Sequence, residues 1–139
     1  MITRTAIAFA AALALGSAAF AAEEHDHHGR SEAKLVLNHG KKWQTDAPLR
    51  KGMENIRAAL ASGKKYPAIG ERVNAEIAYI VQNCKLPEDA DAQLHIVIAE
   101  LMAGAEAMQG EGAREGAARV ARALDAYGEF FDHPGWRKG

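Results

Sequence analysis

The chain has 139 residues, and its 17 basic and 18 acidic side chains give a formal net charge of -1. This balance excludes the strongly basic surface that is typical of nucleic-acid-binding proteins. Only 6% of the residues are aromatic, while alanine and the long helix-forming residues dominate, so the composition predicts a helical protein with a single domain.

The first 21 residues have the composition of a signal peptide. Arg4 supplies a positive charge, residues 6–18 are almost entirely small or apolar, and Ala19-Phe20-Ala21 has the pattern of a cleavage site. The apolar run is shorter than the roughly 20 residues that span a bilayer, and no second run follows it. We therefore expect cleavage after Ala21 and a periplasmic mature protein without a membrane span.

Residues 22–34 are polar, charged and rich in histidine. Little in this stretch can be buried, so we expect a flexible arm before the folded domain. Three imidazoles and the neighbouring carboxylates on such an arm could wrap a Cu(II), Ni(II) or Zn(II) ion without any fold. The arm is thus a candidate accessory metal site, with a solvated linker as the alternative. Its histidines are His25, His27 and His28.

Two helices are predicted in the first half of the domain that follows, residues 35–139. After an extended lead-in over residues 35–37, Thr45 or Asp46 is suited to an N-cap, and this first helix closes near Gly63. The second helix opens at Pro67 and ends before Pro87. Both are recognised by apolar residues three or four positions apart. These are Leu49, Met53, Ile56 and Leu60 in the first helix, and Ile69, Val73, Ile77, Ile80 and Cys84 in the second.

Two more helices are predicted in the second half. The third begins at the acidic pair Glu88-Asp89 and stops at Gly110. The fourth runs from about Ala113 through Phe131 and stops before Pro134-Gly135. Connections this short make consecutive helices antiparallel neighbours. The predicted fold is therefore all-α, an antiparallel up-down-up-down four-helix bundle.

This topology predicts an internal metal site, because it places Met53, Cys84 and His95 near the same end of the bundle. A thioether, a thiol and an imidazole together suit copper(I), and zinc less well. Cys84, in the last turn of its helix, is offset from the other two, but helical side chains lean toward their own N-terminus and this reduces the offset. In the alternative reading, Met53 and Cys84 are core residues and His95 is half-buried at the edge of the apolar stripe.

A second hypothesis is a metal-free interaction module. The aromatic residues Trp43, Tyr127, Phe130, Phe131 and Trp136 map to the end of the bundle that holds both termini. A periplasmic protein partner could dock there on Trp43, Phe130 and Trp136, provided that these side chains are partly exposed.

A third hypothesis is a b-type haem protein, because cytochromes of the b562 and c-prime type are four-helix bundles of similar size. Covalent haem needs the motif C-x-x-C-H, which the residues after Cys84 exclude. Non-covalent haem would need Met53 and His133 as ligands, although His133 fits better as a helix C-cap. Since no Ser-His-Asp set, phosphate-binding glycine loop or H-E-x-x-H element occurs, we expect no enzymatic activity.

Four segments of the chain resemble those of a family of small exported proteobacterial proteins, some of which carry the label DnrO. The segments are KKWQTDAPLR at 41–50, NCKL at 83–86, DAQLH at 91–95 and YGEFFDHPGW at 127–136. The resemblance covers nearly all of the mature chain, including the histidine-rich arm. It implies a periplasmic setting, and the label hints at a denitrification or redox context. The chain departs from the family in its loop at residues 62–66, where relatives are expected to be longer.

Overall fold

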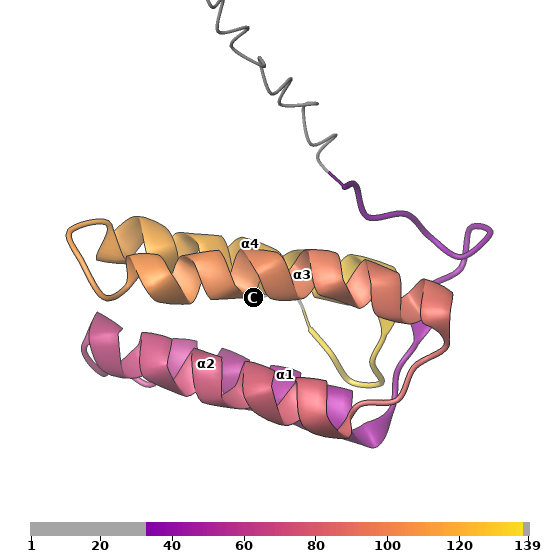
Figure 1. The fold of residues 1–139 in the computed structure, drawn as a ribbon, viewed down its shortest axis with the longest axis horizontal. Coiled ribbons are helices and arrows are strands. Elements are labelled where there is room, and N and C mark those ends of the chain that lie inside the picture. The colour runs from indigo at the N-terminus through magenta and orange to yellow at the C-terminus, as the bar shows by residue number, and fades with distance from the viewer. Residues whose placement is uncertain (1–32, 138–139) are drawn as a thin grey trace, which may run out of the picture. The chain divides into compact units, whose positions relative to one another are not determined.

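The computed structural model describes residues 33–137, so the predicted signal peptide and the histidines of the arm lie outside the described residues. The four-helix bundle expected from the sequence is confirmed. Its helices are α1 (Ala47–Leu60), α2 (Tyr66–Asn83), α3 (Glu88–Ala107) and α4 (Ala113–Phe130), and two short strands, β1 (Trp43–Gln44) and β2 (Phe131–Asp132), flank them. Helices α1 and α2 form one layer, and α3 and α4 form the other (Figure 1).

Side chains and backbones of neighbouring helices make direct contacts. Asn55 in α1 donates a hydrogen bond of 3.0 Å to Glu76 in α2, and Arg119 in α4 forms a salt bridge of 2.7 Å with Glu100 in α3. The backbones of α3 and α4 come especially close, since a Cβ added to Gly116 would lie 2.5 Å from the carbonyl oxygen of Gly104. Any larger residue at position 116 would clash with this oxygen, so the close approach of α3 and α4 requires glycine there.

The helix starts follow local sequence rules. Asp46 is the N-cap of α1, as predicted, and its side chain accepts the backbone N–H of Leu49 at 2.9 Å. Proline lies in the first turn of both α1 and α2, and α3 has the expected acidic first turn. Each of these signals acts within one turn of helix, which is why the sequence located the starts well.

Two helix ends were predicted too far along the chain. Cys84 has extended backbone and is the C-cap of α2, not part of its last turn. Phe131, expected in α4, is instead its C-cap and the first residue of β2. His133 therefore does not cap the helix as predicted. In both places the chain leaves the helix to make tertiary contacts, which residue spacing does not reveal.

The strands were not predicted. They form a two-stranded parallel sheet in which Trp43 pairs with Phe131 and Gln44 with Asp132. The hydroxyl of Thr45 also donates a hydrogen bond of 2.6 Å to the carbonyl oxygen of Asp132. The sheet thus ties the segment before α1 to the segment after α4, and the latter segment, drawn in yellow, continues toward the layer of α1 and α2 (Figure 1).

The aromatic residues gather around Tyr127, which stacks on Phe131 and makes an edge contact with Trp136. Trp136 does not remain at the end of the bundle, however. The guanidinium of Arg57, in the last turn of α1, lies 4.1 Å from its ring, and the indole covers Gly128 of α4. The chain after β2 therefore lies along the seam between α1 and α4.

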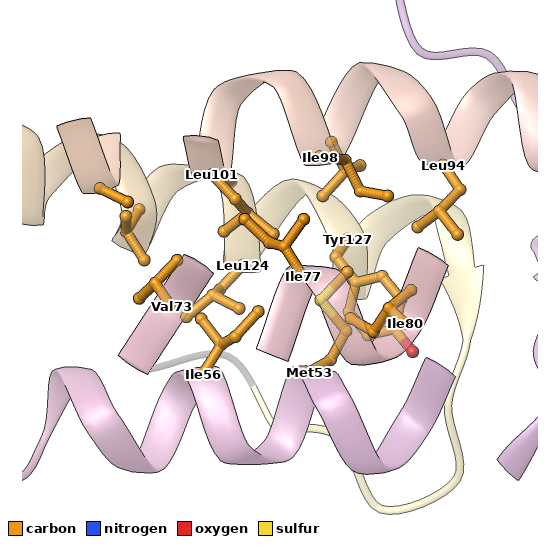
Figure 2. Packing of buried hydrophobic residues seen from close by; sticks show 14 of the residues in the cluster. Met53, Ile56, Val73, Ile77, Ile80, Leu94, Ile98, Leu101, Leu124 and Tyr127 are labelled. Carbon is orange, nitrogen blue, oxygen red and sulfur yellow. The ribbon is translucent and has the colours of Figure 1, made fainter. Parts of the chain in front are cut away.

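The core lies between the two layers and contains the apolar stripes of all four helices (Figure 2). Every stripe residue predicted for the first two helices is buried except Leu60 and Cys84, which are half-buried. None of the helices within residues 33–137 combines the length and the apolar character that crossing a bilayer requires.

Candidate functional site

A pocket of about 150 Å³ lies between the end of α2 and the first half of α3. It contains two of the three side chains predicted to form an internal metal site, Cys84 and His95. The carboxylate of Asp91, one turn before His95, lies there as well. The complete lining is Ile80, Val81, Cys84, Asp91, Leu94, His95 and Ile98.

Cys84 is half-buried, and it is the only cysteine in the chain. Partial burial raises the pKa of its thiol to about 12, and the carboxylate of Asp46 adds to the effect through its charge and a hydrogen bond, with a smaller contribution from Asp91. The thiol is therefore protonated at neutral pH. Any metal ion that binds the sulfur has to displace this proton.

Asp46 connects three parts of this region. One carboxylate oxygen caps α1 at Leu49, the other accepts the backbone N–H of Lys85 at 2.7 Å, and the side chain also accepts the thiol of Cys84. Sequence reasoning assigned Asp46 only as an N-cap. Its contacts with Lys85 and Cys84 depend on the packing of α1 against the end of α2, so residue spacing gave no signal for them.

His95 was expected at the edge of the apolar stripe, half-buried, but its side chain is 63% exposed. Its Nδ1 lies 2.9 Å from the carbonyl oxygen of Asp91 and 3.4 Å from the Asp91 carboxylate. Because a carbonyl oxygen only accepts, the hydrogen bond requires the proton on Nδ1. In the neutral ring Nε2 then carries the lone pair, which is the tautomer that a metal-binding histidine needs.

Met53 does not line the pocket. Its side chain is fully buried in the core, and its sulfur points toward Ile80 and Tyr127 (Figure 2). Cys84, His95 and Asp91 therefore line one pocket, whereas Met53 lies among core residues. Within residues 33–137, no group of three or more histidine, cysteine, aspartate and glutamate side chains has the geometry to hold a metal ion.

A second histidine, His133, lies in a different environment. Its side chain is only 2% exposed; Nδ1 lies 2.9 Å from the hydroxyl of Tyr127, and Nε2 lies 3.0 Å from the carboxylate of Glu54. The ring also contacts Trp136. Burial raises the pKa of the Tyr127 hydroxyl, so this group is a neutral hydrogen-bonding partner.

This cluster, in which the buried Tyr127 and His133 meet the exposed Glu54, was missed at the level of sequence. The available signal was the aromatic character of residues 127–136, which indicated a packed segment but not which polar groups it would enclose. Because both ring nitrogens of His133 already have hydrogen-bonding partners, neither is free to bind a haem iron opposite Met53. The geometry therefore gives no support to the Met/His haem ligation considered above.

Comparisons of this chain with protein-family models, with curated proteins and with solved structures found no match in any of the three.

Proposed function

We propose that this protein is a periplasmic copper-handling protein that binds copper(I) in the pocket between α2 and α3. The ligands are the sulfur of Cys84 and Nε2 of His95. The observation that carries the proposal is that these two side chains, from different helical segments, line the same pocket. Thiolate and imidazole are ligands that select copper(I) over the hard divalent ions.

The surroundings of the two ligands fit this role. The carbonyl oxygen of Asp91 accepts the proton of Nδ1 of His95 and leaves the lone pair on Nε2, as the outer partners of metal-binding histidines usually do. Copper(I) accepts a low coordination number, so a pair of soft ligands can bind it where a divalent ion would need three or four. Met53 has no part in this site, which differs in this respect from the set expected at the level of sequence.

The proton on the Cys84 thiol makes copper(I) binding dependent on pH. With a thiol pKa of about 12, copper(I) binding releases one proton and becomes stronger as the pH rises. The histidines of the arm, His25, His27 and His28, would bind copper(II) or other divalent ions separately from this pocket, as an accessory site.

The test is an anaerobic titration of reduced mature protein with copper(I) in competition with a chromogenic chelator. The protein carries alanine at positions 25, 27 and 28, so that the arm contributes no imidazole. We expect one-to-one binding that Cys84→Ser and His95→Ala each weaken strongly. Met53→Leu, which conserves the volume of a core residue, and His39→Asn, which alters an exposed histidine, are the matched controls. Binding that survives Cys84→Ser would reject the proposal.

A specific observation also favours the interaction module as a second candidate. Val36 is 53% exposed and Leu37 is 41% exposed, and they lie beside the half-buried Trp43, whose Nε1 donates a hydrogen bond to the carbonyl oxygen of Val36. A protein partner that buries this strip would be recognised by apolar contact. Val36→Ser with Leu37→Ser should abolish capture of that partner from periplasmic extract and leave copper(I) affinity unchanged.

A further inference from the structure

A large cavity lies at the opposite end of α2 from Cys84. It has a volume of about 620 Å³ and lies where the second half of α1 faces the first half of α2. This volume falls within the roughly 300–1,000 Å³ of small-molecule sites. The lining residues are Asn55, Ala58, Ala59, Ser62, Lys64, Ala68, Ile69, Glu71, Arg72 and Ala75.

The cavity exists because small side chains occupy the facing positions of the two helices. Nearer the start of α1 the helices pack tightly, and a Cβ added to Gly52 would lie 2.3 Å from Ile80. Farther along, the facing positions are alanines on both helices, and Ile69 is the largest apolar side chain in the lining. Alanine is too short to close the space, so a hollow with an apolar floor remains.

A buried carboxylate organises the polar side of the cavity. Glu76 is 6% exposed, although charged side chains are rarely buried unless they are paired. Its Oε2 accepts the side-chain amide of Asn55 at 3.0 Å, and its Oε1 accepts the guanidinium of Arg72 at 2.5 Å. Both partners line the cavity. Glu76 therefore fixes one hydrogen-bonding amide and one guanidinium at the rim.

The lining carries both signs of charge. Lys64 and Arg72 are cationic, Glu71 is anionic, and the side-chain carbonyl of Asn55 is an acceptor because its amide nitrogen is the atom bonded to Glu76. The guanidinium of Arg72 has five N–H donors in all, in a fork that suits a carboxylate, and Nη2 makes the contact with Glu76. This combination complements a ligand with one carboxylate, one ammonium group and a small aliphatic body.

We propose that the cavity between α1 and α2 binds a small zwitterion of the amino-acid type, with its carboxylate on Arg72 and Lys64, its ammonium group on Glu71 and Asn55, and an aliphatic side chain over the alanines. This site is independent of the copper(I) pocket, since the two share no lining residue. It can exist whether or not the protein binds copper.

The probes are L-leucine, isopentylamine and 4-methylpentanoate, which share one aliphatic body. The amine lacks the carboxylate of leucine, and the acid lacks its ammonium group. Binding to the full mature chain is followed through the backbone amide resonances of Ala59 and Ala68. We expect leucine to shift these resonances at saturation, and each analogue to bind at least about tenfold more weakly, because each leaves charged groups unpaired. No shift with leucine, or equal binding of leucine and either analogue, would overturn the proposal.

Single substitutions test which residues of the cavity contact which group of the ligand. Arg72→Gln should weaken leucine and 4-methylpentanoate by about tenfold or more while leaving isopentylamine unchanged, because only the first two have a carboxylate. Arg114→Gln, at an exposed arginine of α4, is the matched control. Ala68→Met, at an exposed position, should block all three probes by filling the cavity. Circular dichroism establishes that each variant is folded. If neither Arg72→Gln nor Ala68→Met changes leucine binding, leucine binds elsewhere on the protein and the proposed site is rejected.

Discussion

His95 and His133 show how differently the same side chain can be placed in one small bundle. His95 is exposed on α3, and its Nδ1 is hydrogen-bonded to the carbonyl oxygen of Asp91. His133 is buried after α4, with one nitrogen on Tyr127 and the other on Glu54. The first arrangement leaves a lone pair for a ligand, and the second leaves none.

The comparison shows that the hydrogen-bond partners of an imidazole decide whether one of its ring nitrogens keeps a lone pair for a further contact. His133 links the segment after α4 to α1 and stabilises the fold. His95, with a side chain that is 63% exposed, contributes little to packing. Four predictions sharpen or break this contrast.

The largest effect is expected for the stability of the His133 variant. His133→Ala leaves a cavity and deprives the buried Tyr127 hydroxyl of its partner, so the free energy of unfolding should fall by about 2–4 kcal/mol. His95→Ala, at an exposed position, should change it by less than about 0.5 kcal/mol. Urea denaturation measures both. Similar losses for the two variants would remove the distinction drawn here.

In the second prediction, which concerns copper(I) affinity, the His95 variant should show the larger effect. His95→Ala should weaken copper(I) binding by about 100-fold or more, since it removes a proposed ligand. His133→Gln, which retains hydrogen-bonding capacity toward Tyr127 and Glu54, should leave the affinity unchanged under conditions where the variant is folded. The competitive chelator titration compares them. An equal loss in both variants would mean that binding follows overall stability.

The third prediction concerns the proton on Cys84. Because the pKa of its thiol is about 12, each bound copper(I) ion should release one proton, and the affinity should rise about tenfold per pH unit between about pH 7.5 and 9.5. Calorimetry in buffers with different ionisation enthalpies counts the proton directly. An affinity independent of pH would exclude the thiol as a ligand.

The smallest effect is expected for stability at alkaline pH. The pKa of Cys84 is raised from 9.0 to about 12 in the folded protein, and that of Tyr127 is raised above 10.0. The folded state therefore retains protons that the unfolded state releases. The resulting stabilisation is fully present below about pH 9 and is lost as the pH rises through 12.

The variants Cys84→Ser and Tyr127→Phe should each flatten the decline of the urea midpoint above pH 9, since each removes one of these groups. A decline of the same steepness in the double variant would show that other residues cause it.

The fold was largely predictable from the sequence because its signals are local. Asp46, the prolines of the first turns and the apolar spacing each act over one or two turns, and they located four helices and nearly all of their buried faces. The errors occurred at Cys84 and Phe131, where the chain leaves its helix for partners distant in sequence.

The candidate site was predictable only in part. The order of the helices predicted that Cys84 and His95 lie in one region, and the apolar spacing allowed the alternative reading of Met53 as a core residue, which the structure shows. Spacing could not show that Asp91 and Asp46 lie near the thiol. The buried Glu76, which holds Asn55 and Arg72, was equally invisible, because it occupies a polar position next to the apolar stripe of α2.

The sequence by itself thus determined the number, order and inward faces of the helices, because hydrophobic periodicity is a property of each segment alone. Only the tertiary structure decided which polar groups meet. The packing of the helices decides how each helix is rotated against its neighbours. The segment after α4 lies along α1, where His133 contacts Glu54 and Trp136 contacts Arg57. Such contacts join residues about 80 positions apart, and no local pattern encodes them.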